Sequence, residues 1–346
     1  MIEKKIAVVI LNWNGAKLLE QFLPSVINYS DQAKVYVADN ASTDQSIALI
    51  KKQFPSITII QNPINFGFAD GYNYALEQVE EPYYALVNSD IEVTPNWLEP
   101  VLSIFETQPK IGIIQPKILD YKNKGYFEYA GAAGGFIDQY GFPYCRGRLF
   151  ETVEKDSGQY NDEQEIFWAS GACFFIRKDV FRKLQGFDGD FFAHQEEIDL
   201  CWRAFNLGYK VLYTAQSVVY HVGGATLKES NPKKTFLNFR NSLLMLTKNL
   251  PKNKIVSIIA IRLVLDGLAG IQFIFKGKFT HCWAIIKAHF YYYHLINNTI
   301  KKRKGSQSEN YYHTKSIVYE YFVKNHTIFQ KNFNKSLSHF ILIGEK

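Results

Sequence analysis

Short apolar segments alternate with longer amphipathic segments along the first hundred residues. The apolar segments, rich in β-branched residues, lie at positions 6–11, 35–39, 57–61 and 84–88. Such short apolar segments are typical of strands that are buried on both faces of a sheet. Because amphipathic segments separate them, the pattern predicts an α/β fold of Rossmann-like type, with a mostly parallel sheet flanked by helices.

The amphipathic segments predict the intervening helices. We expect helices over residues 16–29, 42–53 and 70–79, and a further helix that begins at Pro95, since proline is favoured in the first turn. The sequence Ser-Thr-Asp at residues 42–44 is typical of a helix N-terminus. Pro24 lies inside the first of these helices, where proline is normally unfavourable.

The second part of the chain changes in character. Residues 121–176 are rich in glycine and aromatic residues and predict irregular strands and loops. A short amphipathic helix is expected over residues 196–207, ended by Gly208, followed by strands at 211–213 and 218–221.

Polar residues stand where the predicted strands end. They are Asn12, Asp39, Asn40, Asn65 and the group Asn88, Ser89 and Asp90. Parallel sheets bind their ligands at the carboxyl ends of the strands, so this repeated placement predicts a binding crevice there. Neither a GxGxxG loop nor a GKS/T loop follows the first strand, which argues against dinucleotide and P-loop ATP sites.

The segment that ends in Asn88, Ser89 and Asp90 has two interpretations. An aspartate on a rigid strand end offers a hard oxygen ligand to a cation that accompanies a diphosphate. Alternatively, these three residues form only a turn before the next helix. The residues alone leave both interpretations open.

Four segments occur in a characteristic order: DNASTD at 39–44, NFGFA at 65–69, NSD at 88–90 and EEIDLCWR at 196–203. Together they resemble the family 2 glycosyltransferases of GT-A fold, in particular the rhamnosyltransferase-like branch. The resemblance covers roughly residues 5–245. It implies a GT-A-type sheet and an inverting transfer from a nucleotide-diphosphate sugar.

The resemblance also implies roles on the donor side. Asp39 matches the aspartate that hydrogen-bonds the pyrimidine base of the donor. Asn65 and Gly67 match the loop beside the nucleotide, and Asn12 matches the polar residue that ends the first strand. All four are therefore expected to bind the nucleotide sugar.

A metal site is implied in the same way. The segment from Asn88 to Asp90 matches the DxD metal motif in an asparagine-first form. Asp90 is then the principal ligand of a divalent cation, Mg²⁺ or Mn²⁺, and Asn88 is a weaker candidate for contact with the nucleotide or sugar. His221 matches a histidine that completes the metal site; otherwise it only ends a strand.

The catalytic base is expected within residues 196–199. The resemblance places it at Glu197, where aspartate is usual, with Glu196 as the neighbouring alternative. An inverting transfer needs such a carboxylate beside the acceptor hydroxyl. Asp199 and Arg203 are spaced as a structural i,i+4 pair. Acids in a first helical turn are also favoured by the helix dipole alone.

The segment 168–176 resembles the acceptor side of the family's site. Trp168, Gly171 and Ala172 are its candidate residues, because small residues let a sugar approach the backbone closely. Cys173 is interpreted as a buried thiol of the core, not as a nucleophile.

Charge is divided unevenly along the chain. Residues 231–346 contain 19 Lys and Arg against 4 Asp and Glu, a net charge of +15, whereas the preceding residues carry −9. Residues 255–275 and 279–300 are long and apolar but contain Arg262, Asp266 and Lys287. Interior charges argue against simple membrane crossing, and flanking lysines suit helices that lie on an anionic membrane. The alternative is a helical subdomain packed on the main domain.

Together these features predict a catalytic GT-A domain at 1–245 and a basic, membrane-proximal helical region at 246–346. We expect transfer of a sugar, with rhamnose as the candidate, to a glycan or lipid-linked glycan during cell-surface polysaccharide synthesis. The widely spaced cysteines and the absence of a signal-peptide pattern favour a cytoplasmic location, peripheral on the inner face of the cell membrane. The acidic body disfavours nucleic acid as a partner. Two alternatives are a sugar-phosphate nucleotidyltransferase and a catalytically inactive, membrane-tethered sugar-binding module.

Overall fold

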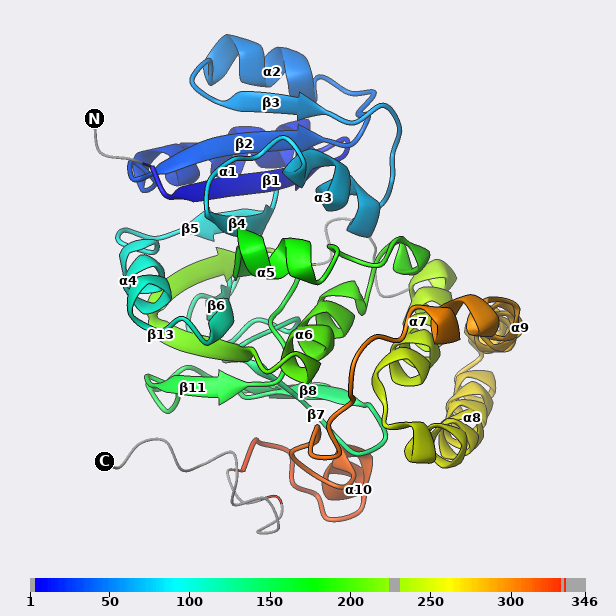
Figure 1. Cartoon of the computed structure of the whole chain (residues 1–346). Helices are drawn as coiled ribbons and strands as arrows, with labels where there is room; N and C mark the ends of the chain where they lie inside the picture. The colour runs from blue at the N-terminus through cyan, green and yellow to red at the C-terminus, as the bar shows by residue number, and fades with distance from the viewer. Residues whose placement is uncertain (1–3, 224–230, 331–332, 334–346) are drawn as a thin grey trace.

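A mixed, mostly parallel sheet forms the centre of the protein (Figure 1). The computed structural model describes residues 4–223, 231–330 and 333. Nine strands within these ranges form the large sheet, in the order β11-β13-β6-β12-β4-β1-β2-β3, with β5 paired to β13. They are β1 (Ile6–Asn12), β2 (Ala33–Asp39), β3 (Thr58–Gln61), β4 (Tyr83–Asn88), β5 (Ile91–Val93), β6 (Ile111–Asp120), β11 (Glu163–Ile166), β12 (Cys173–Arg177) and β13 (Lys210–His221).

The first four strands run parallel, as their apolar sequences predict. Their register aligns Asn12 with Asp39 and places Leu11 opposite Asn88, so the strand ends share one edge. β12 is antiparallel to both of its neighbours, β4 and β6, and the strand direction therefore changes immediately beside β4. The strand order also reverses at β1, with β2 and β3 on one side and β4 on the other, and open α/β sheets bind ligands at the carboxyl ends of the strands beside such a point.

Alternate residues of the central strands enter two separate apolar layers. Ala7 and Val9 of β1 belong to one layer, whereas Ile6, Val8 and Ile10 belong to the other. Because successive side chains of a strand point to opposite faces, a continuous apolar strand must be covered on both. The covering helices of the body are α1 (Ala16–Asn28), α2 (Ser46–Gln53) and α4 (Glu99–Thr107) on one face, and α3 (Ala69–Leu76), α5 (Lys178–Lys183) and α6 (Glu196–Asn206) on the other.

A second, antiparallel sheet lies within the glycine-rich segment. Its strands follow the order β10-β9-β8-β7. They are β7 (Gly135–Ile137), β8 (Pro143–Cys145), β9 (Arg148–Leu149) and β10 (Thr152–Val153). The predicted irregular strands therefore form a small sheet of their own.

Two local predictions were wrong. The helix expected from Pro95 begins at Glu99, because β5 pairs with β13 and Asn96 turns the chain with a φ of 59°. The two late strands form one strand, β13, whose register is interrupted between Thr214 and Val218. A β-bulge of this kind bends a strand without ending it.

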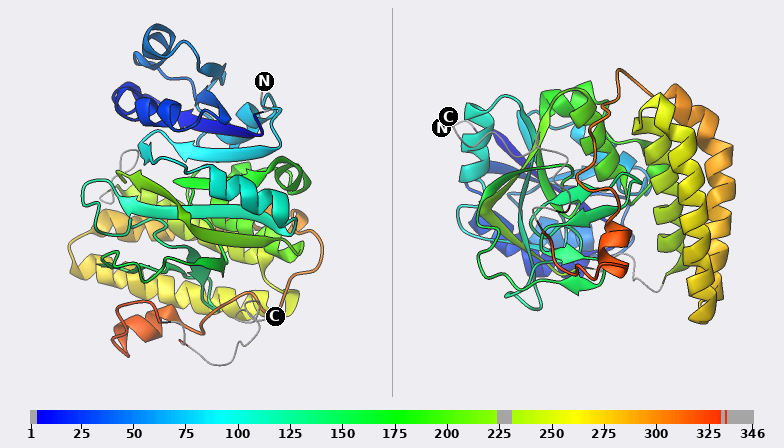
Figure 2. Two further views of the ribbon diagram at one scale, coloured as in Figure 1. Left: turned by 90° about the vertical axis from the view of Figure 1, so that its left-hand side faces the viewer. Right: turned by 90° about the horizontal axis from the view of Figure 1, so that it is seen from below.

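The C-terminal helices form a group alongside the body (Figure 2). They are α7 (Pro232–Asn249), α8 (Lys252–Phe275) and α9 (Phe279–Lys301), followed by the short α10 (Ile317–Phe322). The apolar layer that contains α6 also includes Leu243, Tyr292, Tyr311 and Ile317. This region therefore packs directly on the body, and the division at residue 245 stays a prediction.

Candidate functional site

The ends of β1 and β2 are joined by a buried polar network. The Asn12 amide donates to Asp39 Oδ1 over 3.0 Å and lies 3.1 Å from Ser42 Oγ. The other Asp39 oxygen accepts the backbone N–H of Ser42 over 2.9 Å. Among the residues that the structure describes, Asn12 Oδ1 is buried without a hydrogen-bond partner, and a side chain at Gly15 would collide with it. Gly15 thus leaves space directly beside this network.

A second network shapes the loop between β3 and α3. Asn40 donates to Asn65 Oδ1 over 2.9 Å and to the Gly67 carbonyl over 2.8 Å. Asn62 donates to Asn40 Oδ1 over 3.0 Å. Gly67 has a φ of 75°, and a Cβ there would lie 2.6 Å from Phe192. A glycine is therefore required for this loop to approach the segment before α6.

Asp90 and His221 are adjacent because β5 aligns Ile91 with His221. His221 Nε2 lies 3.2 Å from Asp90 Oδ1, and its Nδ1 lies 3.2 Å from Glu128 Oε1. Burial disfavours the charged imidazole, but the carboxylates of Glu128 and Asp90 outweigh it and raise the pKa of His221 to about 10. This site therefore stabilises positive charge.

A cation would meet suitable but incomplete ligands here. Asp90 offers a carboxylate, an oxygen ligand that suits Mg²⁺ or Mn²⁺, and His221 offers an imidazole that can act as a ligand only after it loses its proton. Within the described ranges, no group of three or more His, Cys, Asp or Glu is placed to hold a metal ion alone. A cation at Asp90 would thus need further oxygens from a bound ligand or water.

Glu196 and Glu197 begin α6 but differ in accessibility. Glu196 is buried, whereas Glu197 keeps partial exposure. Burial raises the pKa of Glu197 to about 7, although backbone N–H groups of the first helical turn oppose the shift. Burial, followed by the charge of Glu197, raises the pKa of Glu196 well above its ordinary range. Glu197 is therefore the more exposed of the two carboxyl groups and ionises near neutral pH, although its Oε2 is buried without a hydrogen-bond partner among the described residues.

The segment before β12 connects the two carboxylate sites. The backbone N–H of Asn88 donates to the Ala172 carbonyl over 2.9 Å. A Cβ at Gly171 would lie 3.4 Å from the Phe68 ring and 3.7 Å from Glu197 Cδ. Gly171 therefore places open backbone between the donor loop and the carboxylate of Glu197.

Trp168 does not join this group of residues. It is buried, and its indole N–H donates to the Phe136 carbonyl over 2.8 Å. Its ring also fills the space above Gly135. In this structure Trp168 therefore packs the core, and Gly171 alone of the three acceptor-side candidates has both exposure and contact with Glu197.

Asp199 lies behind the site. Its carboxylate accepts Arg203 Nε over 2.7 Å, Lys248 Nζ over 2.9 Å and Asn249 Nδ2 over 2.8 Å. Burial opposes its ionisation, but Arg203 and Lys248 hold the pKa of Asp199 below its usual range. Asp199 is fully engaged in supporting α6.

Some residues around the site gave no recognisable signal in sequence. Glu128 lies in the irregular segment, where nothing distinguishes it from other surface acids. Asn241 and Lys248 both lie in α7 yet contact the loop before α6 and α6 itself. Their signal was weak, because α7 mixes polar and apolar residues and these two do not stand out among them.

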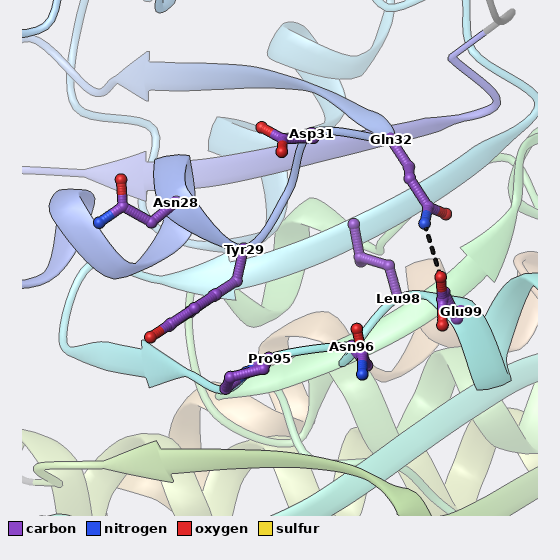
Figure 3. A pocket seen from close by; sticks show the side chains of 8 residues that line it. All are labelled: Asn28, Tyr29, Asp31, Gln32, Pro95, Asn96, Leu98 and Glu99. Carbon is purple, nitrogen blue, oxygen red and sulfur yellow. Dashed lines mark hydrogen bonds between the residues drawn. The ribbon is translucent and has the colours of Figure 1, made fainter.

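A surface pocket of about 150 Å³ lies elsewhere, near the amino end of β2 (Figure 3). Its lining includes Tyr29, Asp31, Gln32 and Glu99, with Gln32 donating to Glu99 over 2.9 Å. The carboxyl edge with Asp39 lies at the other end of the same strand. This pocket therefore does not belong to the candidate site.

Comparisons with known proteins identify the family of this chain. The family described as glycosyl transferase family 2 matches residues 7–185, more than half of the chain. N-acetylglucosaminyl-diphospho-decaprenol L-rhamnosyltransferase from Mycobacterium tuberculosis is 23% identical over 229 residues, which cover 62% of this chain and 75% of that protein. The low-salt glycan biosynthesis hexosyltransferase Agl10 of Haloferax volcanii is 21% identical, covering 86% of this chain and 92% of its own.

Among solved structures, GalNAc-T7 with UDP, GalNAc and Mn²⁺ matches with a TM-score of 0.57 at 15% identity. The match covers 72% of this chain, and it spans about half of the length of GalNAc-T7, 49%. At this identity the likeness concerns the fold, which is the GT-A fold. The chain therefore belongs to glycosyl transferase family 2 and is a glycosyltransferase of GT-A fold.

Proposed function

We propose that this enzyme transfers a sugar from a nucleotide-diphosphate sugar to a hydroxyl of a glycan or lipid-linked glycan, with inversion at the anomeric carbon. One observation carries the proposal. Residues 171–172 lie between the two sides of the site: the Ala172 carbonyl accepts the backbone N–H of Asn88, and a Cβ at Gly171 would lie 3.7 Å from Glu197 Cδ. A donor held at Asp90 would thus present its sugar toward the Glu197 carboxylate.

The nucleotide is proposed to lie along the ends of β1 and β2. Asp39 would accept a hydrogen bond from the base, and Asn12, whose Oδ1 is buried without a partner, would accept another. Asn65 and Gly67 shape the adjacent loop through Asn40. Asn88 is proposed to contact the nucleotide or sugar.

A divalent cation, Mg²⁺ or Mn²⁺, is proposed to bind at Asp90 and His221. The ion would neutralise negative charge on the leaving diphosphate. The bound Mn²⁺ in the structure of GalNAc-T7 supports this assignment by likeness of fold. Asp90 and His221 supply only part of a coordination shell, which suits an ion shared with the donor.

Glu197 is proposed as the general base. Its pKa of about 7 leaves a large fraction ionised at neutral pH, and the same value makes it an effective proton acceptor. The acceptor oxygen gives its proton to Glu197 while it forms a bond to the anomeric carbon. The bond from that carbon to the diphosphate breaks on the opposite side, so the configuration inverts.

Rhamnose is the proposed sugar, and a lipid-linked glycan the proposed acceptor. Both are named in the description of the Mycobacterium tuberculosis relative, whose alignment covers most of the catalytic region. The Haloferax volcanii relative is a glycan biosynthesis hexosyltransferase. A role in cell-surface polysaccharide synthesis follows from these similarities.

The C-terminal helices are proposed to hold the enzyme on the cytoplasmic face of an anionic membrane. Among the described helices, α8 is the one long and apolar enough to span a bilayer. Two charged residues in its interior face other parts of the protein: Arg262 donates to the Tyr140 carbonyl of the body over 3.0 Å, and Asp266 is buried beside His289 of α9. α8 therefore suits a position flat on the membrane, with its apolar outer face toward lipid.

Both α8 and α9 have apolar outer faces. They carry side chains that are each more than half exposed: Val256, Val264, Leu268 and Phe275 on α8, and Phe279, Trp283 and Phe290 on α9. Lys276 and Lys278 stand at the turn between α8 and α9. Apolar side chains flanked by lysines favour the interface of a membrane with negative lipids.

Transfer and donor hydrolysis, measured with a panel of dTDP-, UDP- and GDP-sugars with and without Mn²⁺ or Mg²⁺, test the proposal. We expect cation-dependent release of the nucleoside diphosphate with at least one donor. Formation of a nucleotide sugar from a sugar phosphate would instead indicate a nucleotidyltransferase. Binding of donor without any turnover would indicate an inactive sugar-binding module.

A further inference from the structure

One asparagine of α7 binds three backbone carbonyls of the loop that leads into α6. Asn241 is completely buried, and its Nδ2 lies 2.9 Å from the Phe191 carbonyl, 2.9 Å from that of Ala193 and 2.7 Å from that of His194. An amide nitrogen has two hydrogens, so at least one is shared between carbonyls. This degree of engagement is more than ordinary helix packing requires.

The preceding residue of α7 completes the contact. Arg240 Nε donates to Asn241 Oδ1 over 2.8 Å, which fixes the orientation of the amide. The guanidinium also donates to the carbonyls of Asp190 and Phe191, over 2.8 and 3.0 Å. Arg240 and Asn241 therefore donate hydrogen bonds to four backbone carbonyls of one loop, those of Asp190, Phe191, Ala193 and His194.

The loop needs this support because of its backbone conformation. Phe192, His194 and Gln195 have φ values of 63°, 71° and 72°. These left-handed conformations are unfavourable for residues with a Cβ, and they persist only where surrounding contacts impose them. On the opposite side, the Phe192 carbonyl accepts the N–H of Phe68 over 2.8 Å. The loop is thus held between α7 and the donor-side loop.

The same loop determines the position of Glu197. The Gln195 carbonyl accepts the N–H of Asp199 over 2.9 Å, so the left-handed residue Gln195 lies directly at the start of α6. Glu197 follows in the first turn of this helix. A change in the path of the loop would therefore move the Glu197 carboxylate relative to Gly171.

We infer that Asn241, oriented by Arg240, is a positioning residue that holds the loop before α6 in the one arrangement in which Glu197 reaches the acceptor hydroxyl. This inference rests on the proposed role of Glu197 as the base. Because α7 also packs against α9, the C-terminal helices would contribute through α7 to the position of Glu197.

The full-length variant Asn241→Ala tests the inference. We expect kcat to fall by about 10²-fold, since small displacements of a reacting group have effects of this size. Nucleotide affinity, measured by calorimetry, should stay within a few-fold. The matched control is Thr247→Val, which removes an equally buried hydrogen bond of α7, that to Tyr292, without touching the loop. Thr247→Val should retain kcat within a few-fold, even if its thermal midpoint falls as far as that of Asn241→Ala.

Two results would overturn the inference: an unchanged kcat in Asn241→Ala, or equal losses of kcat in Asn241→Ala and Thr247→Val at equal loss of thermal midpoint. If Asn241→Ala does not fold, Arg240→Lys provides the test, because it keeps the charge but loses the planar fork. The kcat of Arg240→Lys should fall less than expected for Asn241→Ala, and its nucleotide affinity should be unchanged. An unaltered kcat in Arg240→Lys would contradict the inference. Glu197→Gln, measured in parallel, separates the two proposals. Full activity of Glu197→Gln refutes the role of Glu197 as the base. An inactive Glu197→Gln together with an active Asn241→Ala refutes only the positioning role of Asn241.

Discussion

The ammonium group of Lys248 in α7 lies 2.9 Å from the carboxylate of Asp199 in α6, and both side chains are buried. The same ammonium lies 2.7 Å from Asp188, at the start of the loop before α6. One lysine of the C-terminal region thus neutralises two acids that flank the proposed base. The basic charge of this region has a structural use inside the protein in addition to any use at a membrane.

Replacing Lys248 by methionine should therefore destabilise the fold. The change leaves Asp188 and Asp199 with one cationic partner fewer in a buried place, and removal of one member of such a pair typically costs about 3–5 kcal/mol. Urea denaturation measures the free energy of unfolding. Lys5→Met is the control, since the Lys5–Glu106 pair is exposed and should contribute less than about 1 kcal/mol. Equal stabilities of the two variants would contradict a structural role for Lys248.

Asp39→Ala should weaken nucleotide binding by roughly 1–3 kcal/mol, the usual effect of removing a buried hydrogen-bonding partner. The variant loses the acceptor for Asn12 and for the Ser42 backbone, together with the proposed contact to the base. Calorimetry with nucleoside diphosphates measures the change. Asp31→Ala, in the remote pocket of Figure 3, is the matched control and should bind normally. Unchanged affinity in folded Asp39→Ala would remove this residue from the site.

The outer face of α8 and α9 should govern membrane binding. Serine at Phe275, Phe279 and Trp283 removes three largely exposed rings, and we expect affinity for vesicles containing phosphatidylglycerol to fall at least ~10-fold. Vesicles of phosphatidylcholine alone should bind weakly from the start. The control replaces Tyr319 and Phe322 of α10, which are also more than half exposed, by serine. Equal loss in both variants, or a triple variant that binds normally, would exclude this face as the lipid contact.

Transfer should depend on pH through Glu197. Its pKa of about 7 means that the carboxyl group is protonated, and inactive as a base, below that value. The rate should therefore rise with pH through about 7 and then level, as measured by kcat/KM between pH 5 and 9. Glu196 and Asp199 face the same region, but the first ionises only well above its usual range and the second is held ionised by Arg203 and Lys248. A rate that falls as the pH rises through 7 would contradict the assignment.

The parts predicted from sequence are those that depend on local pattern. The continuous apolar sequence of β1 predicts burial on both faces. The polar residues after β1, β2 and β4 predict a crevice at one edge of the sheet. The structure confirms the parallel register that aligns the ends of these three strands. The prediction of a helix from Pro95 was wrong, because proline favours a turn as much as a first helical turn. The pairing of β5 with β13 places Pro95 in a turn.

Long-range contacts could not be read from the sequence. Nothing near Glu128 indicates that it meets His221, 93 positions later, and only the fold brings the two within 3.2 Å. The resemblance implies that Trp168 lies on the acceptor side, whereas in the structure its ring fills the space left by Gly135, which is distant in sequence. Asn241 likewise contacts the loop before α6 across about fifty residues, so its role needed the tertiary structure.

The assignment of Glu197 makes the sharpest distinction between chemistry and binding. A general base acts only when the acceptor attacks, whereas cation and nucleotide contacts form when the donor binds. Glu197→Gln keeps the size of the side chain but cannot accept the proton. Transfer should fall by about 10²–10⁴-fold, the usual contribution of general-base catalysis, while donor affinity stays within a few-fold.

Two neighbouring substitutions serve as the comparison for Glu197→Gln. Asp90→Asn should lose donor affinity and cation dependence together, because it changes the proposed cation ligand. Glu196→Gln should remain nearly as active as the unmodified enzyme, since Glu196 is buried and burial raises the pKa of its carboxyl group, which favours the protonated form that glutamine imitates. Loss of transfer in Glu196→Gln with full activity in Glu197→Gln would move the base by one residue. Full activity in both would mean that the proton is accepted elsewhere, and the inverting mechanism placed at the start of α6 would be wrong.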